Sequence, residues 1–251
     1  MAVSQKGEAG LNLTVNYWQE SARPLVSLAF VFPMLLVYEG GMLLLGPRAM
    51  RNGADVWLRH LLEFMGFGQY FLLPIVTSFI LLAWHHVAHQ SWRIRWPVLS
   101  VMLLECAALG FLLLVFAQVQ GALFASPAAD CTGAGVFLNL NAEIGRVVGF
   151  FGAGIYEELL FRLMLLPAIA AALRSAKASQ RASLIAAALM TSLLFSAAHY
   201  QLFSSAGEAF DWFSFLFRFL AGVFFALVFI FRGFGIAAGT HALYDIFVVF
   251  Q

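Results

Sequence analysis

Long apolar stretches alternate with short polar segments along almost the whole chain. An apolar helix of about 20 residues crosses a hydrocarbon layer about 30 Å thick, and seven stretches come near or exceed that length. They cover residues 25–45, 70–87, 98–119, 142–173, 182–199, 212–231 and 236–250. The pattern predicts an all-α fold, a polytopic membrane helix bundle of about seven transmembrane helices.

Two polar segments predict amphipathic surface helices. In residues 46–68, apolar side chains recur at helical spacing on one face and charged ones lie opposite. The apolar set is Val56, Trp57, Leu61, Leu62 and Met65, against Arg59, His60 and Glu63. This helix could cover a site in the bundle. Residues 11–23, with Tyr17 and Trp18, have the composition of a short helix at the headgroup level, and residues 1–10 are expected to form a mobile tail.

Composition supports a membrane location. The chain has 251 residues, of which 62% are hydrophobic and 11% charged, and its mean hydropathy is +0.87. Soluble proteins are about half apolar and about a quarter charged, so most of this chain should contact lipid. The net charge of +1 gives no reason to expect nucleic acid as a partner. Cys106 and Cys131 are too few and too far apart for a disulfide framework or a CxxC metal site.

The fourth span carries three charges near its centre, Glu157, Glu158 and Arg162. Each charge at the centre of a membrane helix costs roughly 2.5–3.5 kcal/mol, so such residues mark candidate functional sites. Glu158 and Arg162 are four residues apart and share a helix face, where they can pair, whereas Glu157 is rotated by about 100°. Glu157 is therefore left without a partner on its own helix. Gly145 and Gly149 form a GxxxG face that should let a neighbouring helix approach closely.

Other polar residues in the spans are interpreted as structural. Glu39 lies late in the first span and is expected to be hydrated near the interface. Glu105 is expected to pair with an arginine such as Arg146 rather than to join the site. His85 and His89 are four apart and either share a metal ion or mark a helix end at the interface, and the second interpretation is favoured.

The later spans hold two more polar pairs at helical spacing. Phe195 and His199 share one face, as do His241 and Asp245. If both faces converge on Glu157, that carboxylate loses solvation and becomes a competent base toward water. His199 would hold the same water or pass its proton to a leaving amine, and His241, oriented by Asp245, would stabilise an oxyanion.

Each of these features also has a structural explanation. Glu158 and Arg162 can be a plain ion pair. His199 can be an interfacial histidine at a helix end, and His241 with Asp245 a buried, satisfied pair. A structural explanation for all three features at once is less favoured than a structural explanation for any single one. Peptide hydrolysis without a covalent intermediate is the function that the combined set predicts.

In this order and on successive apolar helices, the motifs resemble those of the CAAX protease and bacteriocin-processing (CPBP) family, also called the abortive-infection family. The motifs are Glu157-Glu158-x-x-x-Arg162, Phe195-x-x-x-His199 and His241-x-x-x-Asp245. The resemblance implies an intramembrane glutamic endopeptidase without metal or other cofactor. It further implies that Glu157 and His199 activate water, that His241 and Asp245 build the oxyanion site, and that Glu158 and Arg162 support them.

One position departs from part of that family. Eukaryotic members have Asn where this chain has Asp245, although bacterial members also carry Asp there. An ionised Asp cannot donate a hydrogen bond to an oxyanion, so Asp245 is either protonated or orients His241.

Three parts are expected in the chain, the last from the resemblance and the first two from their context only. Residues 1–24 form an N-terminal tail and interfacial segment, 25–141 accessory transmembrane helices, and 142–251 the catalytic core. The expected partners are the lipid bilayer and a membrane-anchored protein or peptide substrate. The expected location is a bacterial cytoplasmic (inner) membrane. The alternative function is a catalytically silent membrane scaffold or immunity-type partner with the same fold.

Other hydrolase classes and the membrane orientation are weighed from the same residues. A zinc metalloprotease needs dense ligands, and no HExxH occurs. Serine chemistry lacks a GxSxG motif.

Basic loops after the second and fourth spans indicate cytoplasmic placement of those loops, which puts His199 near the far face. The resemblance instead implies a site open to the cytosol, so both orientations stay open.

Overall fold

The structure is a computed structural model that describes residues 17–46, 51–124, 140–201 and 207–250. The predicted mobile tail at residues 1–10, the first part of the predicted interfacial segment at 11–23, and Cys131 lie outside these ranges. In the described part the chain is almost entirely helical, with no strand beyond one isolated bridge between Tyr200 and Glu208. The predicted all-α fold is confirmed.

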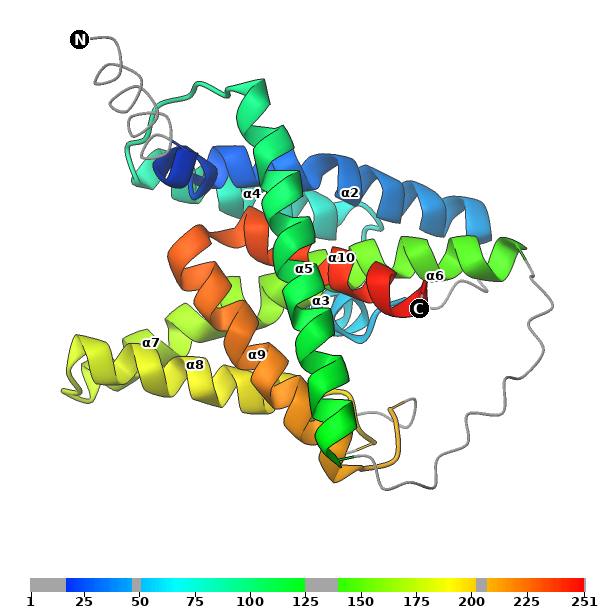
Figure 1. Ribbon diagram of the computed structural model, residues 1–251. Coiled ribbons are helices and arrows are strands. Elements are labelled where there is room, and N and C mark those ends of the chain that lie inside the picture. The colour runs from blue at the N-terminus through cyan, green and yellow to red at the C-terminus, as the bar shows by residue number, and fades with distance from the viewer. Residues whose placement is uncertain (1–16, 47–50, 125–139, 202–206, 251) are drawn as a thin grey trace, which may run out of the picture.

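The helices follow the predicted spans closely (Figure 1). They are α2 (Pro24–Leu45), α3 (Gly53–Phe64), α4 (Leu72–Val87), α5 (Trp96–Phe124), α6 (Leu140–Gly152), η2 (Ala153–Glu157), η3 (Leu159–Leu165), α7 (Leu166–Ser175), α8 (Gln180–Ala197), α9 (Trp212–Arg232) and α10 (Phe234–Val249).

Four of the described helices, namely α2, α5, α8 and α9, are long and apolar enough to cross a membrane. Helices α4 and α10 are apolar but shorter, and the fourth predicted span is a composite of α6, η2, η3 and α7. The chain is therefore an integral membrane protein with several spans. The count of seven is not confirmed.

Helix α10 lies at the centre of the bundle. It contacts α2, α5, α9 and η2, and α8 packs between α7 and α9 (Figure 1). The N-terminal half of α10 is rich in small residues and wholly buried from Phe234 to Ala242. Small side chains let helices approach closely, which is how helices pack in a membrane.

The composite helix changes its geometry around the acidic pair. Both η2 and η3 are π-helical, and Glu158 is the one residue between them. A π-helix hydrogen-bonds from residue i to i+5, is rare, and is frequent at functional sites. The α geometry resumes at Leu166, next to Pro167, which has no backbone N–H to donate.

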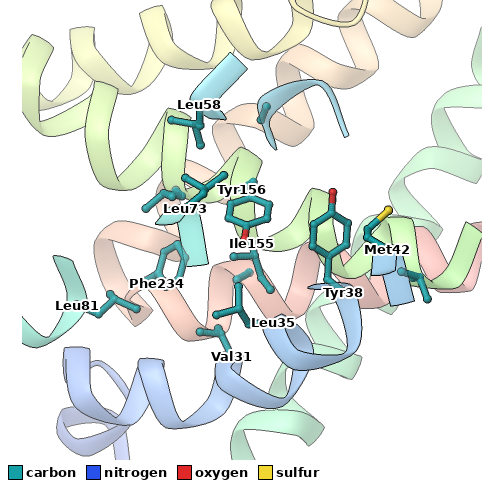
Figure 2. Close-up of a cluster of buried hydrophobic side chains, with 14 residues drawn as sticks. Val31, Leu35, Tyr38, Met42, Leu58, Leu73, Leu81, Ile155, Tyr156 and Phe234 are labelled. Carbon is teal, nitrogen blue, oxygen red and sulfur yellow. The ribbon is translucent and has the colours of Figure 1, made fainter. Parts of the chain in front are cut away.

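The largest apolar cluster joins η2 to α2, α3, α4 and α10 (Figure 2). At its centre the rings of Tyr38 and Tyr156 meet edge to face with centroids 5.5 Å apart, and both residues are fully buried. A Cβ added at Gly152 would lie 2.2 Å from the Tyr38 ring, and one at Gly154 would lie 2.5 Å from the carbonyl oxygen of Ala238. These glycines, in place of the predicted Gly145 and Gly149, make the close helix contacts.

Charged side chains attach α3 to the bundle. Arg59 pairs with Asp55 at 2.6 Å and with Glu39 at 2.8 Å. Tyr38 donates to Asp55 at 2.7 Å, and Tyr156 donates to Glu39 at 2.6 Å. The prediction that Glu39 is hydrated is wrong, because it is 5% exposed and its carboxylate is neutralised by Arg59. The predicted amphipathic helix is present, and these pairs hold it against α2 and η2.

A second ion pair ties the N-terminal segment to the end of α9. Glu105 on α5 pairs with Arg232 at 2.5 Å and also accepts a hydrogen bond from Tyr17. Arg232 donates to the carbonyl of Trp18 at 3.2 Å, and its guanidinium stacks on the Trp18 ring at 3.7 Å. The prediction of an arginine partner for Glu105 is confirmed, but the proposed partner, Arg146, is wrong.

The contrast between two glycines of the composite helix can be tested. Gly154→Ala should lower the free energy of unfolding by about 1–3 kcal/mol, the usual effect of overpacking, because its Cβ would meet the α10 backbone. Gly149→Ala places its Cβ in open space and should raise that free energy by about 0.5–1 kcal/mol, the difference between Gly and Ala in a helix. Thermal denaturation of both variants in one detergent measures this, and equal shifts would contradict the packing described.

Candidate active site

Three helices bring the predicted site residues together. Glu157 is the last residue of η2, His199 follows the end of α8, and His241 lies in α10. Oε2 of Glu157 is 3.9 Å from Nε2 of His199 and 3.8 Å from Nε2 of His241. Both separations exceed a direct hydrogen bond. The predicted convergence of the glutamate with both imidazoles is present in the structure.

The two oxygens of the Glu157 carboxylate have different surroundings. Oε1 accepts a hydrogen bond of 2.6 Å from the side-chain amide of Asn52, at the start of α3. Oε2 is buried and has no hydrogen-bond partner among the described residues. Glu157 as a whole is 7% exposed. One oxygen is thus fixed by the protein, and the other faces the imidazoles.

The ring of His199 is oriented by its own helix. Its Nδ1 lies 2.8 Å from the carbonyl oxygen of Phe195, one turn earlier. A carbonyl oxygen only accepts, so Nδ1 carries the hydrogen, and in the neutral ring Nε2 presents its lone pair. The ring of Phe195 also packs against that of His199, with centroids 5.0 Å apart. The Phe195-x-x-x-His199 spacing therefore selects the tautomer whose acceptor nitrogen faces Glu157.

His241 is held by a carboxylate and two aromatic rings. Its Nδ1 lies 2.8 Å from Oε1 of Glu158. Asp245, the residue expected to orient it, is more distant, with Oδ2 3.8 Å from Nε2. The ring of Phe225 stacks on His241 at 4.5 Å between centroids, and that of Phe195 lies edge-on at 5.9 Å. Glu158 thus makes the direct hydrogen bond, and Nε2 remains directed toward Glu157 and Asp245.

The predicted pair of Glu158 and Arg162 is present and fully buried. Nε of Arg162 lies 3.3 Å from Oε2 of Glu158. Nη2 donates to the carbonyl of Gly222 in α9 at 3.1 Å, and the guanidinium lies 4.4 Å from the centre of the Phe195 ring. The pair therefore joins η3 to α8 and α9. Through Glu158 it also reaches His241.

A cavity of about 480 Å³ opens beside these groups. Its lining residues are mostly apolar. They are Arg51, Asn52, Gly53, Ala54, Val56, Trp57, Glu157, Phe161, Ala198, His199 and Gly207. Helix α3 therefore forms one wall of a space that ends at the glutamate and one imidazole. A peptide segment with apolar side chains fits such a lining.

The C-terminal part of the chain matches a known protein family. Residues 141–247 match a family model described as type II CAAX prenyl endopeptidase Rce1-like. The C-terminal part of the chain is an Rce1-like domain. No curated protein and no solved structure matches the chain significantly.

The Rce1-like domain contains all six predicted site residues, and the predicted family is confirmed. This match supports the interpretation of the chain as a membrane-embedded peptidase. The division of the chain at residue 141 stays a prediction. Asn52, which contacts Glu157, lies outside the Rce1-like domain.

Sequence reasoning missed three contributors to the site. Asn52 is an N-cap, a role that Asn before an amphipathic helix signals. No local pattern says which carboxylate its amide would meet. Phe225 and Gly222 lie in the unbroken apolar run of residues 219–231, so nothing in the sequence marks Phe225 as a neighbour of His241 or the Gly222 carbonyl as a partner of Arg162.

No group of three or more His, Cys, Asp or Glu residues in the described ranges has the arrangement of a metal site. His85, one of the two histidines considered for a metal, is fully buried, and its ring packs edge-on against Trp92 at 4.8 Å.

The buried pair beside the Rce1-like site can be tested by removing its cation. Arg162→Gln removes the arginine that pairs with Glu158 in an apolar interior and should lower the free energy of unfolding by about 3–5 kcal/mol. Arg174→Gln, at an exposed arginine in the last turn of α7, should change it by less than about 0.5 kcal/mol. Denaturation of both variants in the same detergent gives the comparison. A change at Arg162 no larger than that at Arg174 would show that the pair is not structurally required.

Proposed function

We propose that this chain is an intramembrane endopeptidase that hydrolyses a peptide bond of a membrane-associated protein or peptide with water activated by Glu157. The observation that carries the proposal is the placement of the free Oε2 of Glu157, 3.9 and 3.8 Å from two imidazole Nε2 atoms. These separations suit a water held between carboxylate and imidazoles. The Rce1-like domain is of an endopeptidase family.

In the proposed reaction the water loses its proton to Oε2 of Glu157 as its oxygen attacks the peptide carbonyl. Nε2 of His199 accepts the second hydrogen bond of the water, because its tautomer is set by the Phe195 carbonyl. The proton taken by Glu157 then passes to the leaving amine, directly or through His199. No covalent intermediate forms, and the carboxylate returns to its starting state.

The developing oxyanion is placed near His241. In the protonated ring, Nδ1–H donates to Glu158 at 2.8 Å, and Nε2–H is directed into the site as a donor to the oxyanion. Phe225 and Phe195 hold the ring plane. Asp245, at 3.8 Å from Nε2, supports this arrangement in one of two ways: ionised, it orients His241, and protonated, it is a second donor.

The proposed substrate class follows from the cavity. Its walls are largely apolar side chains from α3, η3 and the end of α8. An extended peptide with aliphatic residues next to the cleaved bond would bury them there. A CAAX-type tail, a leader peptide and a sorting tail all have this character. The proposed location is a bacterial cytoplasmic membrane.

The glutamate can be tested by an isosteric change. Glu157→Gln retains an oxygen that accepts from Asn52 but cannot take a proton, so the rate of cleavage should fall about 10²- to 10⁴-fold. A farnesylated peptide with a Cys-aliphatic-aliphatic-X terminus is the first probe, assayed with protein in nanodiscs. Glu63→Gln, at an exposed glutamate of α3, is the matched control. If Glu157→Gln folds normally and keeps full activity, the silent scaffold becomes the better explanation.

Metal removal provides an independent test. Because a carboxylate activates the water, cleavage should be unchanged after incubation with EDTA or 1,10-phenanthroline. The rate of cleavage of the same peptide is measured before the chelator is added, and again after the treated protein has been dialysed to remove it. Loss of activity that zinc restores would contradict the proposed mechanism and favour a metalloprotease.

A further inference from the structure

Helix α3 brings to the site a polar residue that lies outside the three sequence motifs. Asn52 directly precedes α3, and its Nδ2 donates to Oε1 of Glu157 at 2.6 Å. The contact joins residues 105 positions apart in the chain. It is shorter than the separations between Glu157 and the two imidazoles, which are 3.9 and 3.8 Å.

The orientation of the Asn52 amide is fixed by two bonds at once. Its Oδ1 accepts from the backbone N–H of Ala54 at 2.8 Å and so caps α3. The reversed amide would place an oxygen against the Glu157 carboxylate and an NH₂ group against an N–H. Both contacts would be repulsive, so capping the helix and donating to Glu157 require the same orientation.

The position of α3 itself is strongly constrained. Asp55, one turn after Asn52, has a fully buried side chain and accepts from Tyr38 at 2.7 Å, Arg59 at 2.6 Å and Arg51 at 2.7 Å. Withdrawing Asn52 would disturb these buried charges, and breaking such pairs is strongly destabilising. The donor is therefore pre-organised against Glu157.

We infer that Asn52 is a positioning residue for the general base: it holds Oε1 of Glu157 so that Oε2 faces the two imidazoles. The inference rests on the proposed function of Glu157. A hydrogen bond to a carboxylate also favours its ionised form, which a base needs. The charged and titratable groups around Glu157 come from every neighbouring element. They are His199 after the end of α8, His241 and Asp245 from α10, Glu158 and Arg162 from its own composite helix, and Arg51 beside Asn52.

Two substitutions that retain the N-cap of α3 separate the capping role of Asn52 from its hydrogen bond to Glu157. Asn52→Ser retains a good N-cap but removes the donor to Glu157. It should lower kcat about 10- to 100-fold, the range expected for a hydrogen bond to a charged group, with little change in KM. The acidic limb of the pH–rate profile should move to higher pH, because the ionised carboxylate loses stabilisation.

Asn52→Asp has the same shape and also caps well, but places an acidic oxygen against Glu157. The acidic limb should move further in the same direction than in Asn52→Ser. The control is Ser179→Ala, which removes the N-cap of α8 and should leave kcat and the pH profile unchanged. Thermal denaturation of each variant accounts for any loss of folded protein.

The outcomes distinguish this inference from the proposed function. Parental kcat and pH profile in both Asn52 variants, with Glu157→Gln inactive, would overturn the positioning role and leave the proposed function standing. Full activity of Glu157→Gln would instead overturn the proposed function. An activity-independent readout is infrared titration of the Glu157 carboxyl, identified by its absence in Glu157→Gln. It should titrate at higher pH in Asn52→Ser, and an unchanged titration would also count against the positioning role.

Discussion

The buried pair of Glu158 and Arg162 is the interaction on which the site depends. Two adjacent carboxylates in an apolar bundle are sustainable only if at least one is neutralised. Arg162 neutralises Glu158, and its Nη2 donates to the backbone carbonyl of Gly222 in α9. Glu158 in turn holds Nδ1 of His241. A single arginine thus joins three helices and leaves the neighbouring acid, Glu157, free for a different environment.

The rest of the bundle follows the same rule that buried charges are paired across helices. Glu39 and Asp55 share Arg59, which fastens α3 to α2. Glu105 and Arg232 fasten the N-terminal segment to the end of α9. Between these clusters, apolar side chains and small residues pack the helices closely but do not by themselves fix which faces meet. The polar pairs therefore set which helix faces which, and the apolar core fills the space between them.

What could be predicted from sequence was what is local along a helix. The pairing of Glu158 with Arg162 and the shared face of Phe195 and His199 follow from a spacing of four residues, and both are present. Partners distant in sequence were not accessible in this way. The arginine that meets Glu105, for example, is set by how α5 and α9 pass each other. The same holds for Asn52, whose amide meets Glu157 only because α3 is folded back over η2.

The π-helical stretch has a consequence for how this chain can vary in length. Gly154 contacts α10, and Arg162 donates to the backbone of α9. The chain between these two residues is π-helical, so the two contacts are positioned by a wider helix than an α-helix. Deleting one residue there would return the stretch toward α geometry and turn its two ends relative to each other by about 100°. Either the contact of Gly154 with α10 or that of Arg162 with α9 would then be lost. Insertions and deletions should accordingly be excluded from this segment while the loops outside it tolerate them.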